Sequence, residues 1–429
     1  MTAPYRFETL CLHAGHTPDA ETRSRAVPVY RSTSYVFDSS DHAASLFALR
    51  EPGHIYSRMT NPTQQVLEKR MTALEGGGGA LALASGTAAI YYAVINICSA
   101  GDAIVAANNL YGGTMTMFHN ILPQFGIRVD FVDPRNPGNF AEAIREETRA
   151  LFMETIGNPS LEVVDLSAVA EVGRQYNLPV IVDSTFTTPH LMRPLEFGAD
   201  IVVHSLTKWI GGHGTGIGGI VVDGGRFDWT DPKFSLYNTP DPSNFNLRFA
   251  KDLGEKNSLA FIERMRQVPL RNLGACISPD NAWLFLQGLE TLPLRMERHC
   301  ENAGQAAEFL RNHPAVAWVR YPGLPGDPAH PTASRYLRNG YGAMVVFGIK
   351  GGREAGKRFI DRLKLFSHLA NVGDAKSLAL HPASTTHSQL TEEQQLAGGL
   401  YPDMIRLSIG IESISDILAD LDQALAGSA

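Results

Sequence analysis

Between about residue 66 and residue 220, short apolar runs alternate with stretches whose apolar residues recur at helical spacing. The alternation begins with a helical pattern at 63–76 and a strand-like run at 80–85. Five further runs are short and mostly rich in β-branched residues, at 102–107, 127–133, 150–155, 179–184 and 200–205. Such runs are typical of buried parallel strands. The pattern predicts an α/β fold in which helices cover both faces of a mainly parallel sheet.

Polar residues stand at the ends of three of these runs, as Glu154, Asp183 and Ser205. In open α/β sheets, ligands bind at the carboxyl ends of the strands. We therefore expect the three side chains to face one shared crevice.

Three regions differ in pattern and indicate the domain organisation. Residues 1–65 are rich in Pro, Ser, Thr and Arg without sustained periodicity, which predicts an extended arm that packs on a neighbouring subunit. Residues 66–285 form the predicted larger domain, which carries the crevice, with a loop-like excursion of unassigned role at 222–257. A smaller α/β domain is predicted at 286–429, with apolar runs at 315–321, 342–349, 364–370 and 404–410.

Composition and charge narrow the class of function. The net charge of −7 and the absence of a Lys/Arg-rich run argue against a nucleic-acid surface. Four scattered cysteines indicate neither a disulfide framework nor a zinc site. The N-terminus lacks a signal-peptide pattern, and the most apolar stretch, at 88–98, is about half the length of a membrane span. These features predict a cytoplasmic enzyme that acts on small molecules, with no membrane partner.

The pair of Asp183 and Lys208 suggests a particular cofactor. Pyridoxal phosphate needs a lysine for covalent attachment and a carboxylate that keeps its ring nitrogen protonated. Each residue alone has an ordinary explanation, because an aspartate at a strand end is often a helix cap and most lysines are solvated. Hydroxyls at Ser205 and Thr207 flank the lysine and could donate to a phosphate.

A second phosphate-binding element stands earlier in the chain. Gly86 and Thr87 open a helix after a strand, where backbone N–H groups and the helix dipole bind anions. Tyr111 stands between a strand and a helix, so its ring could lie over the cofactor or simply pack in the core.

Other motifs are weaker. The glycine string at 214–219 matches GxGxxG but precedes a strand, so close backbone packing is the better interpretation. No P-loop pattern occurs. The histidine pairs lack the context of a known metal site, and we expect no metal; they are His13 and His16, His204 and His213, and His381 and His387.

Several ordered motifs together resemble the Cys/Met-metabolism pyridoxal-phosphate enzymes over essentially the whole chain. They are YSRMTNPT (56–63), ASGTAAI (84–90), YGGT (111–114), ETIGNPS (154–160), VDSTF (182–186), HSLTKW (204–209) and RLSIGIE (406–412). The resemblance implies a type I pyridoxal-phosphate transferase fold with a seven-stranded sheet and a smaller C-terminal α/β domain.

The resemblance also implies roles for single residues. Lys208 would hold the cofactor, Asp183 would pair with its ring nitrogen, and Tyr111 would stack on the ring. The phosphate would be held by Gly86, Thr87, Ser205 and Thr207, and by Tyr56 and Arg58 from a neighbouring subunit. Asn158 would lie near the phenolic oxygen, and Arg406, aided by Ser377, would bind the substrate carboxylate, with Tyr56 also near the substrate. An obligate dimer, commonly doubled to a tetramer, would follow.

Two positions depart from the family pattern. Ser184 stands where asparagine is usual, and Thr87 stands where Met or Gln is frequent. Ser184 puts some hydrogen bonding behind the cofactor in doubt, whereas Thr87 should matter little if its backbone N–H is the donor.

Within the family, the stretches at 222–257, 275–299 and 371–390 look like the O-acetylhomoserine sulfhydrylase branch. That branch implies γ-replacement, in which O-acetyl-L-homoserine and sulfide give L-homocysteine and acetate. A cystathionine-forming synthase and a γ-lyase share the same cofactor residues and stay open. A non-catalytic pyridoxal-phosphate protein is the alternative outside enzymes.

Overall fold

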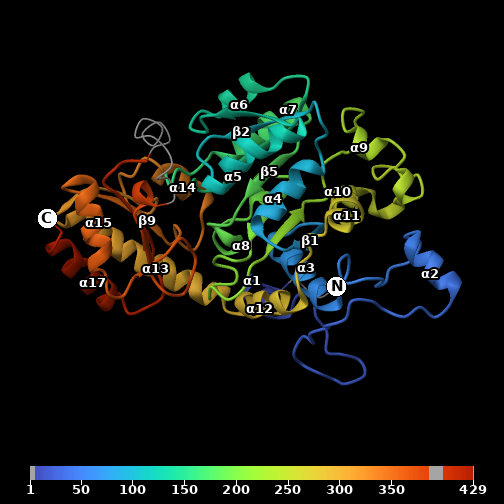
Figure 1. Ribbon diagram of the computed structural model, residues 1–429, viewed down its shortest axis with the longest axis horizontal. Coiled ribbons are helices and arrows are strands. Elements are labelled where there is room, and N and C mark those ends of the chain that lie inside the picture. Colours follow the sequence, from blue (N-terminus) through green and yellow to red (C-terminus); the bar gives the residue numbers. More distant parts are fainter. Residues whose placement is uncertain (1–4, 386–399, 429) are drawn as a thin grey trace.

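The computed structural model describes residues 5–385 and 400–428, which form two sheets with flanking helices (Figure 1). The larger sheet has seven strands in the order β1-β7-β6-β5-β4-β2-β3. Its strands are β1 Gly79–Leu83, β2 Ala103–Ala107, β3 Arg128–Val132, β4 Thr148–Glu154, β5 Val180–Asp183, β6 Ile201–Ser205 and β7 Gly219–Asp223. Strands β3, β2, β4, β5 and β6 run parallel, and β7 pairs antiparallel with both β6 and β1. The predicted mainly parallel sheet is therefore confirmed.

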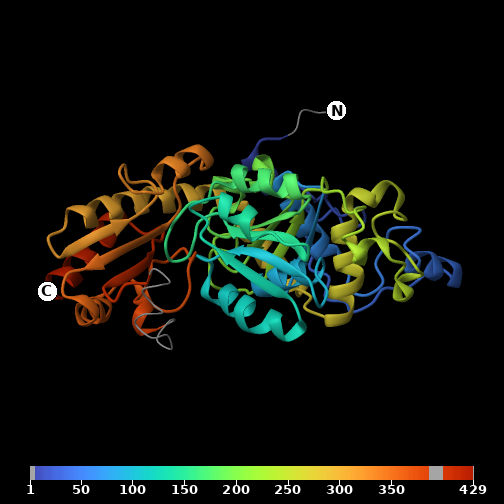
Figure 2. The ribbon, with the colours of Figure 1, turned by 90° about the horizontal axis from the view of Figure 1, so that it is seen from above.

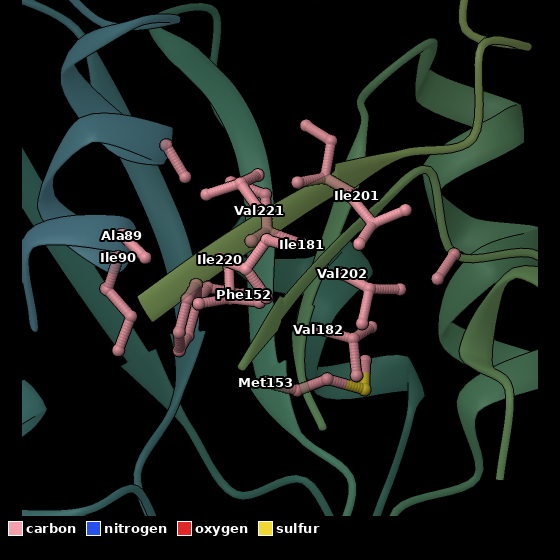
Figure 3. Close-up of a cluster of buried hydrophobic side chains, with 14 of the residues drawn as sticks. Ala89, Ile90, Phe152, Met153, Ile181, Val182, Ile201, Val202, Ile220 and Val221 are labelled. Atoms are coloured by element: carbon pink, nitrogen blue, oxygen red, sulfur yellow. The ribbon is translucent and has the colours of Figure 1, made fainter. Parts of the chain in front are cut away.

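The central strands are buried on both faces, which explains their nearly continuous apolar sequences. Every residue of β2, β5 and β7 is buried. Figure 3 shows the interleaved side chains of this core, among them Phe152, Ile181, Val202 and Val221. This packed layer is a rigid base for the side chains at the ends of the strands.

Helices lie above and below the larger sheet (Figure 2). Of these, α4 packs against β6 and β7, while α3 packs against β1 and α12. Asn61 caps α3 through its side chain and Pro62 follows at the first position, a combination that favours a helix start there. The helices of this part are α3 Pro62–Glu75, α4 Gly86–Ile95, α5 Gly112–Thr116, α6 Gly138–Ala143, α7 Leu166–Tyr176, α8 Thr188–Leu191, α10 Ala260–Met265, α11 Arg271–Leu273 and α12 Pro279–Glu290.

The smaller sheet has five strands in the order β10-β11-β12-β9-β8. They are β8 Val316–Arg320, β9 Met344–Ile349, β10 Ser367–His368, β11 Leu378–Leu380 and β12 Met404–Ser408. Its helices are α13 Leu292–Asn312, α14 His330–Tyr336, α15 Gly352–Arg362 and α17 Ile414–Ala426. The two buried clusters meet within α13, since Cys300 belongs to the larger and Ala303 to the smaller. The domain boundary near 286 stays a prediction.

The N-terminal segment contains two short helices that the absence of periodicity did not predict. Helix α1 (Phe7–His13) packs on α3 and α12 and buries Cys11. Helix α2 (Ser40–Phe47) stands away from the body, at the opposite end of the molecule from the C-terminal sheet (Figure 1).

The excursion at 222–257 is anchored to α4. It contains the short helix α9 (Ser235–Asn238), whose buried Tyr237 hydroxyl donates to the Asn96 carbonyl at the end of α4. Nowhere in the described part of the chain does a helix combine the length and apolar character that crossing a membrane requires.

Candidate active site

A cavity of about 980 Å³ opens at the carboxyl ends of β4, β5 and β6. Glu154, Asp183 and Ser205 all line it, so the shared crevice predicted from the strand ends is confirmed. The N-terminus of α4 contributes Gly86 and Thr87. The smaller domain contributes further lining residues, among them Asn371 and Arg406.

Lys208 lies in the turn that follows β6, and its amine points into this cavity. Its Nζ donates to Oδ1 of Asn371 at 2.5 Å. Burial, aided by the charge of Arg406, lowers the pKa of the Lys208 amine to about 8. An amine with that pKa can exist in its neutral, nucleophilic form near neutral pH.

The turn that carries Lys208 is held from behind by a buried cation. Arg295 donates to the carbonyls of Trp209 at 2.6 Å, of Ile210 at 3.1 Å and of Gly288 at 2.6 Å. Gly212 adopts a φ of +73°, and a Cβ there would meet the Arg295 guanidinium at 2.1 Å. The lysine backbone is therefore fixed by neighbours that tolerate little displacement.

Asp183 presents a buried carboxylate to the same cavity, at the end of β5. Its Oδ1 accepts from the N–H of Thr185 at 2.9 Å and from the Thr185 hydroxyl at 2.5 Å. Burial raises the pKa of Asp183, while the Thr185 hydrogen bonds and nearby His204 act in the opposite direction. A protonated ring nitrogen against this carboxylate would be the positive partner that a buried charge requires.

Ser184, which stands where asparagine is usual in the family, has a hydrogen-bond partner of its own. It is fully buried, and its hydroxyl shares a 2.7 Å hydrogen bond with the Thr187 hydroxyl. The polar side chain behind the cavity is thus satisfied without an asparagine.

The part of the cavity at the N-terminus of α4 is suited to a phosphate. Ser85 caps the ten-residue helix α4 by accepting from the N–H of Ala88. The other N–H groups of the first turn have no intrahelical acceptor, and this turn lines the cavity. A Cβ on Gly86 would meet Cβ of Ser205 at 2.6 Å, so only glycine permits this close approach. Thr207 lies beside them, and its hydroxyl also bonds the backbone of Gly218. The donor set fits pyridoxal phosphate.

Arg406, on β12, reaches the cavity from the smaller domain. Its Nη1 donates to Oδ1 of Asn158 at 3.1 Å, which places both predicted residues together. Burial lowers the pKa of Arg406 to about 10. Ser377 is not brought to the cavity: it is fully buried, and its hydroxyl donates to Glu412 and accepts from the N–H of Gly410.

Tyr111 lies at the cavity rim, at the start of α5, with its side chain half exposed. Tyr56 and Arg58 lie on the N-terminal arm, where the Arg58 guanidinium sits 4.9 Å from the centre of the Tyr56 ring. Neither residue lines the cavity of its own chain, and Arg58 Nε donates to the Arg271 carbonyl. Their predicted contact with a neighbouring subunit stays a prediction.

The glycine string packs closely beside the lysine turn, as we inferred from the sequence. A Cβ on Gly219 would meet the Ser85 carbonyl oxygen at 2.1 Å, and one on Gly218 would meet the Phe285 ring at 2.3 Å. Among residues 5–385 and 400–428, no three His, Cys, Asp or Glu side chains gather as a metal site would require. His204 instead contacts Glu75 at 2.5 Å, and His387 lies outside the described residues.

Among the cavity residues that the sequence did not identify, Asn371 is the one that contacts the Lys208 amine. It follows the apolar run at 364–370, which the sequence assigned to the smaller domain and not to the crevice, and the resemblance placed weight on Ser377, six positions later. In the structure, the glycine of the surrounding stretch NVGDAKS, Gly373, adopts a φ of +78°, and a Cβ there would meet the backbone of Trp209 at 2.6 Å. Close packing against the residue after Lys208 brings this loop to the lysine.

Comparisons with known proteins agree with this geometry. The sequence profile of the family described as "Cys/Met metabolism PLP-dependent enzyme" matches residues 8–426. The chain is 53% identical to an O-acetyl-L-homoserine sulfhydrylase of Leptospira meyeri, over 99% of this chain and 98% of that protein. It is 50% identical to a homocysteine synthase of Schizosaccharomyces pombe, over 98% of both chains.

A solved structure is similar over its full length. It is described as an O-acetylhomoserine (thiol)-lyase from Campylobacter jejuni with N′-pyridoxyl-lysine-5′-monophosphate. Its TM-score to this chain is 0.95 at 39% sequence identity, with 99% of this chain and 100% of that one covered.

Proposed function

Because the chain belongs to the Cys/Met metabolism PLP-dependent enzyme family, we propose that it makes L-homocysteine and acetate from O-acetyl-L-homoserine and sulfide. Its cofactor is pyridoxal phosphate. The full-length likeness to O-acetyl-L-homoserine sulfhydrylases is the observation that carries the choice of reaction. The cavity supplies the residues that such a reaction needs.

We assign the parts of the cavity to the cofactor as follows. Lys208 holds it covalently, Asp183 keeps its ring nitrogen protonated, and Tyr111 lies on its ring. The first turn of α4 and the hydroxyls of Ser205 and Thr207 hold its phosphate. The bound cofactor supplies an electron sink for the bond-breaking steps at the substrate.

The chain's own residues then bind the substrate and move protons. Arg406 binds the α-carboxylate, because its planar fork can donate two parallel hydrogen bonds to it. Once the substrate amine has replaced it on the cofactor, Nζ of Lys208 would take the proton from Cα and pass it on to the cofactor. The same Nζ, neutral again, would then take a proton from Cβ, so that acetate can leave Cγ with the bonding electron pair. Tyr111 lies at the same rim and assists as an acid. We retain Ser377 only as a support for the loop that carries Asn371, since its hydroxyl is occupied by Glu412 and Gly410.

Tyr56 and Arg58 complete the site of a neighbouring subunit in this proposal. Both lie on the arm outside their own cavity, and helix α2 of the same arm stands away from the body (Figure 1). A dimer is then the smallest active unit, and a pair of dimers is the proposed assembly. We also propose the cytoplasm as the compartment.

The test is an assay of purified protein with O-acetyl-L-homoserine, in the presence and absence of sulfide, that follows acetate and homocysteine. We expect both products to form together and only with sulfide. Ammonia and a 2-oxo acid formed without a thiol would instead indicate a γ-lyase. Cystathionine formed with cysteine in preference to sulfide would indicate the synthase, and no turnover with any O-activated homoserine would indicate a non-catalytic protein.

A further inference from the structure

Glu154 is a cavity residue for which the reaction above has no use. It is the last residue of β4 and lies directly opposite Asp183, the last residue of β5, in the parallel register. Both side chains are buried, with 5% and 9% of their surfaces exposed. They are the two acidic side chains among the described residues that line the cavity.

Glu154 makes a backbone contact that fixes the start of α5. Its Oε1 accepts from the N–H of Tyr111 at 2.7 Å. The Tyr111 ring folds over Gly113, where a Cβ would meet the ring at 2.5 Å. The carboxyl of Glu154 on one side and the bare glycine on the other therefore determine where the Tyr111 ring lies.

The surroundings of Glu154 disfavour a negative charge there. Its charged neighbour is Asp183, of the same sign, and no ion pair to Glu154 forms within the described part of the chain. The two cations of the cavity are engaged elsewhere, since Lys208 bonds Asn371 and Arg406 bonds Asn158. Asp183 accepts two hydrogen bonds from Thr185, which favour its charged form, whereas among the described residues Glu154 accepts only the one from the Tyr111 N–H.

We propose that Glu154 is a positioning residue that works uncharged, fixing Tyr111 over the cofactor while leaving Asp183 as the single negative charge at that end of the cavity. Ionising two adjacent buried carboxyl groups together costs free energy, because the two negative charges repel each other. The hydrogen bonds decide which of the two keeps the proton. The direction of the pKa agrees: burial first, and then Asp183, raise the pKa of Glu154 well above its ordinary value. The inference rests on the proposed cofactor but not on the thiol or the leaving group.

Replacement by glutamine separates the uncharged role from a charged one. Glu154→Gln keeps the oxygen that accepts from Tyr111 and puts an N–H donor in place of the acid O–H. We expect its dissociation constant for pyridoxal phosphate, measured by adding the cofactor to cofactor-free protein, to stay within about twofold of wild type. Glu154→Leu, similar in size but without an acceptor, should weaken binding about tenfold or more. A glutamine variant as weak as the leucine variant would overturn the proposal, as would a leucine variant that binds normally.

A second measurement reports the proton itself and needs no cofactor. A carboxyl whose pKa is higher in the folded than in the unfolded protein makes stability fall as pH rises from the unfolded pKa to the folded one. The melting temperature of cofactor-free wild type should therefore fall relative to that of Glu154→Gln between about pH 5 and about pH 8. A difference that stays constant or reverses with pH would mean that Glu154 is ionised.

Asp223 offers a matched control for both measurements. It ends β7 at the opposite edge of the sheet, is buried, and its pKa is raised to about 7 by burial. Asp223→Asn should reproduce the pH-dependent change in melting temperature without altering cofactor affinity. If it weakens cofactor binding as much as Glu154→Leu does, the affinity losses reflect general damage and the positioning role is wrong.

A double-mutant cycle tests the route through Tyr111. Tyr111→Ala keeps the backbone N–H but removes the ring that Glu154 is proposed to place. In that background, Glu154→Leu should weaken cofactor binding by less than about threefold, because the ring it positions is already gone. Full additivity of the two losses would show that Glu154 acts by another route and would overturn the proposal.

Discussion

The amine of Lys208 donates a hydrogen bond to Oδ1 of Asn371 at 2.5 Å, joining the lysine turn of the larger domain to a loop of the smaller one. The acceptor is an uncharged amide, so it holds the amine without stabilising the ammonium form as a carboxylate would. With a pKa of about 8 for this amine, a fraction of roughly a tenth is neutral at pH 7. A base that must remove a proton from Cα needs that neutral fraction.

Asn371→Asp should shift the pH dependence of the reaction. A carboxylate in contact with the amine favours the ammonium and should raise the pKa of Lys208 by about 1–3 units. Because the neutral form is the active one, the rising limb of kcat should move to higher pH by the same amount. At pH 7 the rate should fall about tenfold or more. A kcat profile from about pH 6 to about pH 10 measures the shift.

Asn120→Asp is the control for this change. Asn120 also lines the cavity but is exposed, and the Lys208 amine bonds Asn371 and not Asn120. Its replacement adds the same charge without touching the amine, so the rising limb should move by less than about half a unit. Equal shifts in the two variants would show that the effect is one of overall charge and that the contact with Asn371 has no special part.

Gly86→Ala should weaken cofactor binding. The new Cβ would meet Cβ of Ser205 at 2.6 Å and its Cα at 2.9 Å, so the start of α4 must move away from the strand end. We expect the dissociation constant for pyridoxal phosphate to rise at least about tenfold, because the displaced N–H groups would no longer point at the phosphate oxygens. Spectroscopic titration of cofactor-free protein measures it.

Gly304→Ala is the control: it should raise stability and leave the affinity for pyridoxal phosphate unchanged. Gly304 lies inside α13, and a Cβ there meets nothing within 4 Å. Alanine in a helix interior is more favourable than glycine by about 0.5–1 kcal/mol. If both variants bind the cofactor alike, then the contact between Gly86 and Ser205 does not govern the phosphate end.

The sequence predicted the parts of the site that strand ends place and missed the parts that loop packing places. Glu154, Asp183 and Ser205 could be brought together because parallel strands end at one edge of a sheet. Asn371 could not, since its loop is set by contacts distant in sequence: Ala375 N–H donates to the Gly212 carbonyl, and Gly373 N–H donates to the Ser408 hydroxyl. No local pattern encodes such pairings.

Short elements were missed for a related reason. Strand β11 has three residues and helix α1 has seven, too few for a hydrophobic period to be legible. The resemblance to a family predicted the roles of single residues from their motifs. The structure brings two of these residues, Arg406 and Asn158, into contact. Ser377, predicted to aid Arg406, is not brought to the cavity, because its side chain turns toward Glu412.

Arg406→Ala should act mainly on substrate binding. Removal of the guanidinium deletes a charge-assisted pair of hydrogen bonds to the carboxylate, and KM for O-acetyl-L-homoserine should rise about 10- to 100-fold. The change in kcat should be smaller, because the contact is made in both ground and transition states. Steady-state kinetics at saturating sulfide separate the two constants. Arg135→Ala, at an exposed arginine paired with Asp133, is the control, and an unchanged KM in Arg406→Ala would reject the assignment.

Mixed dimers should show whether the arm completes the partner's site. Lys208→Ala should be inactive because it lacks the base, and Arg58→Ala should be strongly impaired because it lacks a phosphate contact. In a dimer with one subunit of each kind, the site that retains Lys208 would receive an intact Arg58 from the other subunit. One of the two sites is then complete, whereas the other carries both lesions.

The expected activity of the mixture follows from counting. If subunits exchange freely in an equal mixture, half of the dimers are mixed and each has one complete site, so about a quarter of wild-type activity should return. Were Arg58 to serve its own subunit, every lysine-bearing site would lack it and no activity would return. Lys208→Ala mixed with Arg406→Ala is the control, assayed with O-acetyl-L-homoserine far below the raised KM, where Arg406→Ala alone has little activity. Arg406 lines the cavity of its own chain, so mixing should add nothing to that activity. Recovery in the first mixture and not in the second would establish that the arm of one subunit reaches the cofactor of the other.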